Sequence, residues 1–344
     1  MNKNDYLVSI CVPIYGVEKY IERCAVSLFE QTYQNIEYIF VNDCTKDNSI
    51  DILRQTMERY PNRVSQVHII EHKHNTGLAG ARNTAVKSAT GDFIMHVDSD
   101  DYVSVDIVSR SVAKQKEFNA DIVVIDFIRK YPTYQQIFQY TNFKKSELYC
   151  LNVLARNNSN SIWAKLIRRS LYVDYNIKCK EGCNQGEDYQ VVPKLLYHAH
   201  IIANLNSPLY IYDCINQNSY TNNFSAIKLK QNWESMNSIR NYFADKGEEY
   251  IIAVQKGRLR QLADDFIVSA KTSGEVSVIY YKYALNILSK INHKYWKSVP
   301  ISKRIILYLS NHFLLMKIYI LTARAIRKSS LKFIDKINNK RKQL

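Results

Sequence analysis

The strongest chemical signal in the sequence is the run Asp98-Ser99-Asp100-Asp101, which directly follows the apolar stretch 93–97. Ligands of parallel sheets bind outside the carboxyl ends of the strands, so these acids stand where chemistry is expected. Carboxylates one residue apart on a turn can converge on a hard divalent cation, which prefers oxygen ligands. An Asp-rich turn that only caps the next helix would have the same sequence. The run alone therefore leaves a metal site and a structural turn equally open.

A second acid, Asp43, ends the apolar stretch 36–41. Acids at two strand ends on one sheet edge favour a shared pocket over two unrelated turns. The glycine-containing segment 75–83 then opens a helix, where backbone N–H groups suit a phosphate and Arg82 would add a fixed cation. A glycine turn with a surface arginine is the alternative. This segment is neither a GxGxxG nor a Walker sequence, so it does not support a dinucleotide site or an ATP motor.

A carboxylate pair, Glu187-Asp188, follows Gly186 at the expected start of another helix. A carboxylate there could act as a general base if the fold returns it to the same pocket. An isolated pair of this kind is more often an N-terminal helix acid that the macrodipole stabilises. These residues alone leave both interpretations open.

Alternating strand and helix patterns must position these side chains. Strands are expected at 7–13, 36–41, 64–70, 93–97 and 122–128, with helices at 17–28, 47–60, 78–88 and 105–119. The alternation predicts an α/β fold with a parallel sheet. Less regular helices are expected at 146–156 and 189–198, and strands at 201–205 and 209–212. From residue 226 onward only helical patterns occur, broken near Gly247, Gly274 and Pro300.

Taken together and in this order, the motifs resemble those of family 2 glycosyltransferases. The resemblance covers roughly residues 6–215 and depends most on the Asp98–Asp101 turn combined with Gly186-Glu187-Asp188. It implies the nucleotide-sugar-binding GT-A fold, Rossmann-like with a mostly parallel sheet, followed by a helical C-terminal extension. It also implies an inverting, metal-dependent transfer of a sugar from a nucleotide diphosphate, expected to be UDP, with Mn²⁺ or Mg²⁺ as cofactor. The acceptor would be a hydroxyl of a glycan, expected to be lipid-linked, in cell-surface polysaccharide synthesis.

The resemblance assigns roles to individual residues. The donor-binding set is Pro13 and Tyr15 at the nucleoside, Asp43 at the uracil, Arg82 by the base or diphosphate, Asp98 at the ribose, and Asp101, which would support the turn and contact the donor sugar. Asp100 would bind the metal. Asp188 would be the base that deprotonates the acceptor hydroxyl, and Glu187 would orient the site. Trp163 and Lys165 would lie on the acceptor side, although a buried Trp flanked by solvated cations is an equal alternative.

Two residues depart from the family pattern. Gly16 stands where the family usually has Asn, and Cys44 adds a Cβ where the turn after Asp43 usually has Gly. These departures leave the acids intact but put the geometry of the loop in question. They motivate a competing hypothesis: a non-catalytic nucleotide-sugar-binding or membrane-scaffold protein with a decayed site.

Charge is distributed unevenly along the chain. The 344 residues carry 47 Lys+Arg and 32 Asp+Glu, a net charge of +15, yet segment 294–344 alone holds 13 Lys and Arg and one acid. Its apolar positions recur at three- to four-residue steps: 305, 306, 309, 313, 316, 320, 323, 326 and 334. Such a basic amphipathic helix can lie on an anionic membrane surface, whereas a helix packed on the protein is the alternative. No specific nucleic-acid partner is expected, because no module that reads nucleic acid is recognisable.

These features predict three parts: a GT-A domain in 1–225, a helical extension in 226–293 and a basic amphipathic tail in 294–344.

The seven cysteines form no CxxC pair and several lie in apolar runs, which predicts buried, reduced thiols. No signal core and no stretch of about 20 uncharged apolar residues is present. The expected location is cytoplasmic, peripheral on the inner face of the cell membrane.

Overall fold

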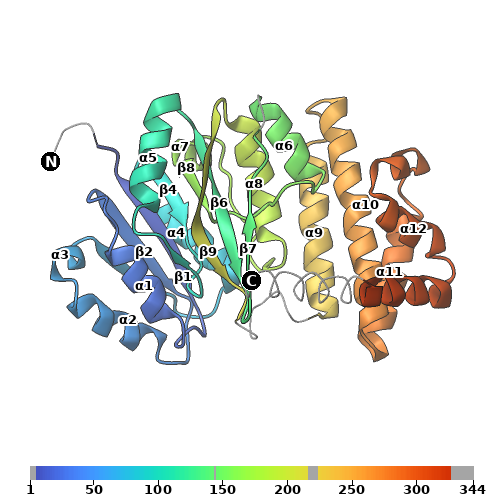
Figure 1. The fold of residues 1–344 in the computed structure, drawn as a ribbon, viewed down its shortest axis with the longest axis horizontal. Helices are drawn as coiled ribbons and strands as arrows, with labels where there is room; N and C mark the ends of the chain where they lie inside the picture. The colour runs from blue at the N-terminus through green and yellow to red at the C-terminus, as the bar shows by residue number, and fades with distance from the viewer. Residues whose placement is uncertain (1–4, 143–144, 216–223, 327–344) are drawn as a thin grey trace, which may run out of the picture. The chain divides into compact units, whose positions relative to one another are not determined.

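A computed structural model describes residues 5–142, 145–215 and 224–326 (Figure 1). The chain divides into two compact units. The first runs to Val153, resumes at Asn157 and adds Gln231–Tyr242; the second takes Leu154–Arg156, Phe224–Lys230 and the chain from Phe243 on. The predicted boundaries at 225/226 and 293/294 stay predictions.

The first unit is built on a nine-stranded sheet in its described residues. Its strands are β1 (Val8–Ile14), β2 (Ile36–Asn42), β3 (Val67–Glu71), β4 (Phe93–His96), β5 (Tyr102–Val103), β6 (Ile122–Lys130), β7 (Gln135–Phe138), β8 (Lys165–Arg168) and β9 (Ile202–Asp213). The order across the sheet is β3-β2-β1-β4-β8-β6-β9-β5, and β7 pairs with β6. The helices of this part are α1 (Ile21–Phe29), α2 (Ser49–Glu58), α3 (Pro61–Val64), α4 (Gly77–Ser88), α5 (Ile107–Phe118), α6 (Ser146–Leu154), α7 (Ser170–Asp174), α8 (Glu187–His198) and α9 (Ala226–Tyr242).

The predicted α/β fold is confirmed. Strands β3, β2, β1 and β4 are mutually parallel, so their carboxyl ends share one edge of the sheet. Every residue of β1 and β2 is buried, as expected for parallel strands covered on both faces. Tyr15, Asp43 and Asp98 each follow a strand that ends at this edge.

Two expectations about the strands need correction. Strand β3 begins at Val67 rather than at residue 64, because Pro61 opens the short helix α3. The two strands expected within 201–212 are the single strand β9, which stays paired with β6 through a register shift at Asp126. In addition, β8 lies antiparallel between β4 and β6, a strand order that was not predicted from the sequence.

The second unit is helical, as the sequence predicts. Beyond the start of α9 it contains α10 (Glu248–Lys271), α11 (Gly274–Leu288), the 3₁₀ helix η2 (His293–Ser298), α12 (Ile301–Leu309) and a helix over 313–326. Gly247 and Pro300 precede α10 and α12, and Gly274 opens α11, so the three predicted breaks are confirmed.

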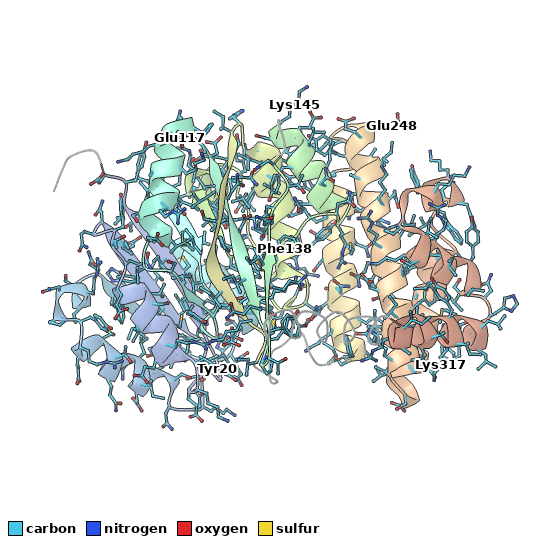
Figure 2. The ribbon with its side chains drawn as sticks, in the orientation of Figure 1. Tyr20, Glu117, Phe138, Lys145, Glu248 and Lys317 are labelled. Carbon is cyan, nitrogen blue, oxygen red and sulfur yellow. The ribbon has the colours of Figure 1, made fainter. Side chains whose placement is uncertain are left out.

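The apolar stripe predicted in the tail is buried only in part: Ile326 is 62% exposed, and position 334 lies outside the described residues. Three of its members are 5% exposed or less: Ile306, Met316 and Ile320. The exposed apolar side chains of the helix over 313–326 include four others, 42–68% exposed: Leu314, Leu315, Ile318 and Leu321. Lys317 lies on the same helix (Figure 2). Within 5–142, 145–215 and 224–326, no helix is long and apolar enough to cross a membrane.

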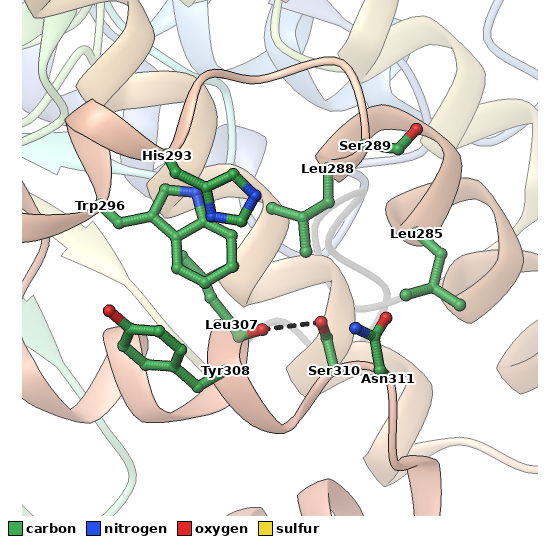
Figure 3. Close-up of a pocket in the computed structure, with 9 residues that line it drawn as sticks. All are labelled: Leu285, Leu288, Ser289, His293, Trp296, Leu307, Tyr308, Ser310 and Asn311. Carbon is green, nitrogen blue, oxygen red and sulfur yellow. Dashed lines mark hydrogen bonds between the residues drawn. The ribbon is translucent and has the colours of Figure 1, made fainter.

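A pocket of about 310 Å³ lies within the second unit (Figure 3). Leucine side chains of α11 and α12 line it together with the rings of His293, Trp296 and Tyr308. The Trp296 ring stacks on His293 with centroids 4.4 Å apart and meets Tyr308 edge-on at 5.0 Å. Its lining includes none of the residues predicted to do chemistry.

All seven cysteines are free thiols, five of them buried, as predicted.

Candidate active site at the carboxyl edge of the sheet

A buried arginine lies at the centre of the predicted site. Arg82, on α4, is 2% exposed, and its Nη2 atom is 3.1 Å from Asp98 Oδ1. The same nitrogen is 3.6 Å from carboxylate oxygens of Glu187 and Asp188 at the start of α8. The side chains of Asp98 and Asp188 are 23% and 16% exposed, so these acids reach solvent while Arg82 lies beneath them. The predicted acids of β4 and α8 therefore meet at one place.

Burial and neighbouring charges set the protonation of this cluster. Burial, together with the charge of Asp188, raises the pKa of Glu187 from its usual 4.5 to about 8, although Arg82 opposes the shift. Burial also raises the pKa of Asp188, against the lowering effect of Arg82. Burial alone would lower the pKa of Arg82, but Asp98, Asp188 and Glu187 together raise it well above its usual value. The cluster thus holds a cation and two carboxyl groups with raised proton affinity.

The two oxygens of the Asp188 carboxylate differ in their contacts, and Oδ1 is the one that lies 3.6 Å from Arg82 Nη2. The Oδ2 atom accepts the N–H of Ile162 at 3.1 Å. The Oδ1 atom is buried and accepts no hydrogen bond from the described residues. A buried acceptor left unsatisfied costs about 1–3 kcal/mol, which a substrate hydroxyl at this oxygen would relieve.

The carboxylates of the acidic turn after β4 have different partners. Asp98 faces Arg82, whereas Asp101 is fully buried and accepts the O–H of Tyr210 at 2.7 Å and the N–H of Asp213 at 2.8 Å. The Tyr210 oxygen in turn accepts the N–H of Asp98 at 3.1 Å. Burial raises the pKa of Asp101 well above its usual range. Asp101 therefore supports the turn from below, and its contact with the donor sugar stays a prediction.

Arg23, on α1, holds the same turn and was not predicted from the sequence. Its Nη2 donates to the backbone oxygen of Asp100 at 3.0 Å, and its Nη1 lies 2.7 Å from Asp213 Oδ2. Its guanidinium also lies 4.4 Å from the ring centroid of Tyr102. An arginine between the inward positions of an amphipathic helix is usually a surface cation, so periodicity provides no signal for this role.

The acidic turn carries oxygen ligands of the kind that a hard divalent cation prefers. Asp100 offers carboxylate oxygens on a turn that Arg23 fixes at the sheet edge. Within the residues that the structure describes, no three His, Cys, Asp or Glu side chains are grouped to hold a metal. Mg²⁺ is commonly bound through one or two carboxylates plus substrate phosphates, so a preformed cage is not required.

Asp43 also lies at this edge, but the protein occupies most of its carboxylate. Oδ1 accepts the N–H and the O–H of Thr76, each at 2.8 Å, and lies 2.8 Å from His72 Nδ1. Oδ2 accepts the N–H of Gly77 at 2.8 Å. A carboxylate has about four acceptor positions, so Oδ2 keeps one for a base N–H. The uracil contact of Asp43 stays a prediction, and His72 is a partner that spacing did not indicate.

The start of α4, predicted to suit a phosphate, is occupied by the protein's own side chains. Asp43 accepts the N–H of Gly77, and Asn184 Oδ1 accepts the N–H of Ala79 at 3.0 Å. A Cβ at Gly77 would lie 2.1 Å from the Asn184 amide, and its φ of +77° also favours glycine. The sequence shows the glycine loop but not the acceptors that fold onto it.

The remaining predicted residues differ in exposure. Pro13 is buried in β1, and Tyr15 is 54% exposed beyond the strand end. Trp163 is 9% exposed and stacks on Tyr210 with centroids 4.7 Å apart. Lys165 is 1% exposed at the start of β8, so its ammonium group is not a solvated cation.

Comparison with known sequences agrees with this geometry. Residues 9–176 match the family model for Glycosyl transferase family 2. EpsJ of Bacillus subtilis (strain 168), described as an uncharacterized glycosyltransferase, is 34% identical over 219 residues, which span 60% of this chain and 60% of EpsJ. The chain thus spans less than two thirds of this relative.

Solved structures share the fold over nearly the whole chain. Staphylococcus aureus TarS 1–349 in complex with UDP-GlcNAc matches with a TM-score of 0.70 and 21% identity, covering 94% of this chain and 92% of that one. The mannosyltransferase PcManGT from Pyrobaculum calidifontis, in complex with GDP-Man and Mn²⁺, matches with a TM-score of 0.54 and 15% identity, over 94% of this chain and 87% of that one. These likenesses confirm the predicted GT-A fold with a helical C-terminal region.

Proposed function

We propose that this chain, whose residues 9–176 match the model of glycosyl transferase family 2, is an inverting, metal-dependent glycosyltransferase. It moves a sugar from a UDP donor to a hydroxyl group of a glycan. The observation that carries the proposal is the guanidinium of Arg82, which brings Asp98 and Asp188 together at the sheet edge. The UDP-GlcNAc bound to TarS, which has the same fold, supports the choice of nucleotide.

In the proposed reaction Asp188 accepts the proton of the acceptor hydroxyl as its oxygen attacks the anomeric carbon of the donor sugar. The new glycosidic bond forms while the bond from that carbon to the diphosphate breaks on the opposite face, so UDP leaves and the configuration inverts. The raised pKa of Asp188 makes it a stronger base than an ordinary aspartate, and positioned bases contribute ~10²–10⁴-fold to such steps. Glu187, with a pKa of about 8, mostly keeps its proton at pH 7 and orients its neighbours.

Donor binding is proposed for the residues around the acidic turn and the first loops: Pro13, Tyr15, Asp43, Arg82, Asp98 and Asp101. Arg82 is a positioning residue in this scheme, because it is buried beneath Asp98 and Asp188. Asp100 would hold Mn²⁺ or Mg²⁺, which would supply positive charge next to the leaving diphosphate.

The release of UDP tests this proposal. The full-length protein is incubated with a panel of UDP-sugars and glycan acceptors, with and without Mn²⁺, and free UDP is measured. Asp188→Asn should keep donor binding by calorimetry and reduce release by roughly 100-fold or more. Asp100→Asn should lose Mn²⁺-dependent donor binding. The control Asp51→Asn, at an exposed position on α2, should match the wild type in donor binding and in UDP release.

Two results would contradict the assignment. Wild-type release by Asp188→Asn would remove this residue as the base. Donor binding without UDP release for every acceptor would support the non-catalytic nucleotide-sugar-binding protein instead. These outcomes separate the chemistry from the binding, because calorimetry reports donor binding independently of turnover.

We further propose that the acceptor is a lipid-linked glycan in cell-surface polysaccharide synthesis and that the enzyme works at the inner, cytoplasmic face of the membrane. TarS, whose curated name is poly(ribitol-phosphate) beta-N-acetylglucosaminyltransferase, is 29% identical over 213 residues. In this chain, Leu314, Leu315, Ile318 and Leu321 are spaced to share one face of their helix and are exposed. The segment 294–344 supplies 13 cations and one acid. An exposed apolar face beside excess cations is typical of an interfacial helix.

Vesicle flotation tests the membrane proposal. The wild type should float with vesicles that contain phosphatidylglycerol and much less with pure phosphatidylcholine or at high salt. The combined substitution of Leu314, Leu315, Ile318 and Leu321 by Ser should abolish flotation. Tyr134→Ser with Ile137→Ser, at residues 56% and 58% exposed in the first unit, is the matched control. Equal flotation of all three proteins would refute the proposal. Point variants are preferable to truncation at 293, which would remove the buried residues Ile306, Leu307 and Met316.

A further inference from the structure

Lys165 is a buried cation in the first unit. It is 1% exposed, and its Nζ donates to the backbone oxygen of Ser161 at 2.6 Å and to the hydroxyl oxygen of Tyr140 at 3.3 Å. The same Nζ lies 4.9 Å from the ring centroid of Tyr140. Within the described part of the chain, no carboxylate lies within ion-pair distance of it. Lysine is almost never fully buried without a counter-charge, so this position needs a specific reason.

The carbonyl group that Lys165 holds belongs to the loop that holds the proposed base. Ser161 directly precedes Ile162, whose N–H donates to Asp188 Oδ2 at 3.1 Å. The Ser161 hydroxyl is also hydrogen-bonded to the Tyr140 hydroxyl at 3.0 Å. Lys165 and Tyr140 together therefore fix the peptide group that orients the carboxylate.

The same loop is anchored to the acidic turn on its other side. Trp163 stacks on Tyr210, and the Tyr210 hydroxyl donates to Asp101 and accepts the N–H of Asp98. Between Trp163 and Lys165 the chain turns through Ala164 at φ 53°, a left-handed conformation that a residue with a Cβ adopts only under constraint. A displaced Lys165 would therefore disturb the relation between the base and the acidic turn.

Charged groups approach Asp188 from four elements. They are Arg82 on α4, Asp98 after β4, Glu187 on α8 and Lys165 on β8. Burial raises the pKa of Asp188, and Arg82 and then Lys165 are the cations that counter the shift. Loss of the Lys165 charge would raise the proton affinity of the carboxylate further.

We propose that Lys165 is a positioning residue for Asp188, acting through the Ser161 carbonyl and the Ile162 N–H rather than on the acceptor itself. This inference rests on the proposed function, because it needs Asp188 to be the base. It replaces the acceptor contact expected from the sequence, since an ammonium group that is 1% exposed and already bonded to Ser161 and Tyr140 cannot reach a glycan.

Lys165→Met tests the inference, with Lys114→Met as the control. Lys114 lies on α5 and pairs with Glu117, away from the site. In Lys165→Met, calorimetry should show UDP-sugar binding within about twofold of the wild type, and kcat should fall by roughly tenfold or more. The acid limb of the kcat/KM profile should move to higher pH, which a purely structural loss would not cause. Lys165→Arg, which keeps the charge, should restore the limb toward its original position.

Tyr140→Phe provides a second variant in case Lys165→Met does not fold. It removes the hydroxyl that contacts Lys165 and Ser161 but keeps the ring, and it should produce a smaller shift in the same direction. If the wild type transfers sugar while Lys165→Met, or Tyr140→Phe in its place, keeps its kcat and its acid limb, the inference is overturned and the proposed function stands. If the wild type transfers no sugar to any acceptor, both are overturned.

Discussion

Arg82 Nη2 lies 3.1 Å from Asp98 Oδ1, the shortest of the three contacts that this buried guanidinium makes with carboxylates. Arg82→Met should therefore be strongly destabilising, because it leaves Asp98, Glu187 and Asp188 crowded together without a cation. Removing one partner of a buried ion pair costs about 3–5 kcal/mol. Urea denaturation at pH 7 would measure this loss as a lower free energy of unfolding.

Arg54→Met is the matched control for this prediction. Arg54 lies 3.6 Å from Glu71, but both side chains are half-exposed, so the pair should contribute about 0–1 kcal/mol. Equal losses for the two variants would show that Arg82 does not hold the acid cluster together.

Glu187→Gln should stabilise the protein in a pH-dependent manner. The pKa of Glu187 is raised by burial to about 8 in the folded state, against a usual 4.5. The folded state thus keeps the proton longer than the unfolded state, and the contribution of this group to stability falls as the pH rises from about 4.5 through about 8. The substitution removes this loss, so the gain in Tm should be near zero at pH 4 and several degrees at pH 9. Glu117→Gln, at an exposed residue of α5, should show no such trend; a flat gain in Glu187→Gln would contradict the burial of a titrating group.

The elements that carry the acids could be predicted because the signal is local. Apolar runs followed by an acid at residues 43 and 98 mark strand ends without any knowledge of their neighbours. The insertion of β8 between β4 and β6 could not be predicted, because it depends on which distant segments compete for a strand edge. The same limit applies to the tail. Periodicity predicts an apolar stripe there, but it does not predict which of its residues are buried and which are exposed to solvent.

The contacts that hold the site residues could not be predicted from the sequence, for the same reason. Tyr210 reaches Asp101 from a strand more than a hundred residues later in the chain, and Arg23 reaches Asp213 from α1. Spacing in the sequence carries no information about such pairs. The acids could be named from the sequence, but the residues that hold them could not.

Arg23→Met should weaken metal-dependent donor binding without unfolding the protein. The substitution removes the hydrogen bond to the backbone oxygen of Asp100 and the ion pair with Asp213, so the acidic turn becomes looser. Hydrogen bonds to charged groups contribute about 1.5–3 kcal/mol, which corresponds to a roughly 10- to 100-fold weaker UDP affinity in the presence of Mn²⁺ if the turn must be reordered on binding.

Calorimetry with UDP and Mn²⁺ measures this effect. Arg59→Met is the control, since Arg59 forms an exposed pair with Glu22 at 2.9 Å and lies outside the turn. Unchanged affinity in Arg23→Met would mean that Tyr210 and Asp101 are enough to hold the turn.

Cys44→Gly should stabilise the loop in which this chain departs from the family 2 pattern. Cys44 has φ 60°, the left-handed conformation, so the backbone has kept the geometry that glycine normally provides although the residue has changed. A left-handed conformation costs an L-residue about 1–2 kcal/mol, and glycine loses about 0.5–1 kcal/mol through its more flexible unfolded state. Urea denaturation should therefore show a net gain of about 0.5–1 kcal/mol for Cys44→Gly, whereas Cys44→Ala, which keeps the Cβ, should show none. Equal stability of the two variants would mean that the loop relaxes without cost. Because the Asp43 carboxylate is held by Thr76, Gly77 and His72, we expect UDP affinity to be unchanged in both variants.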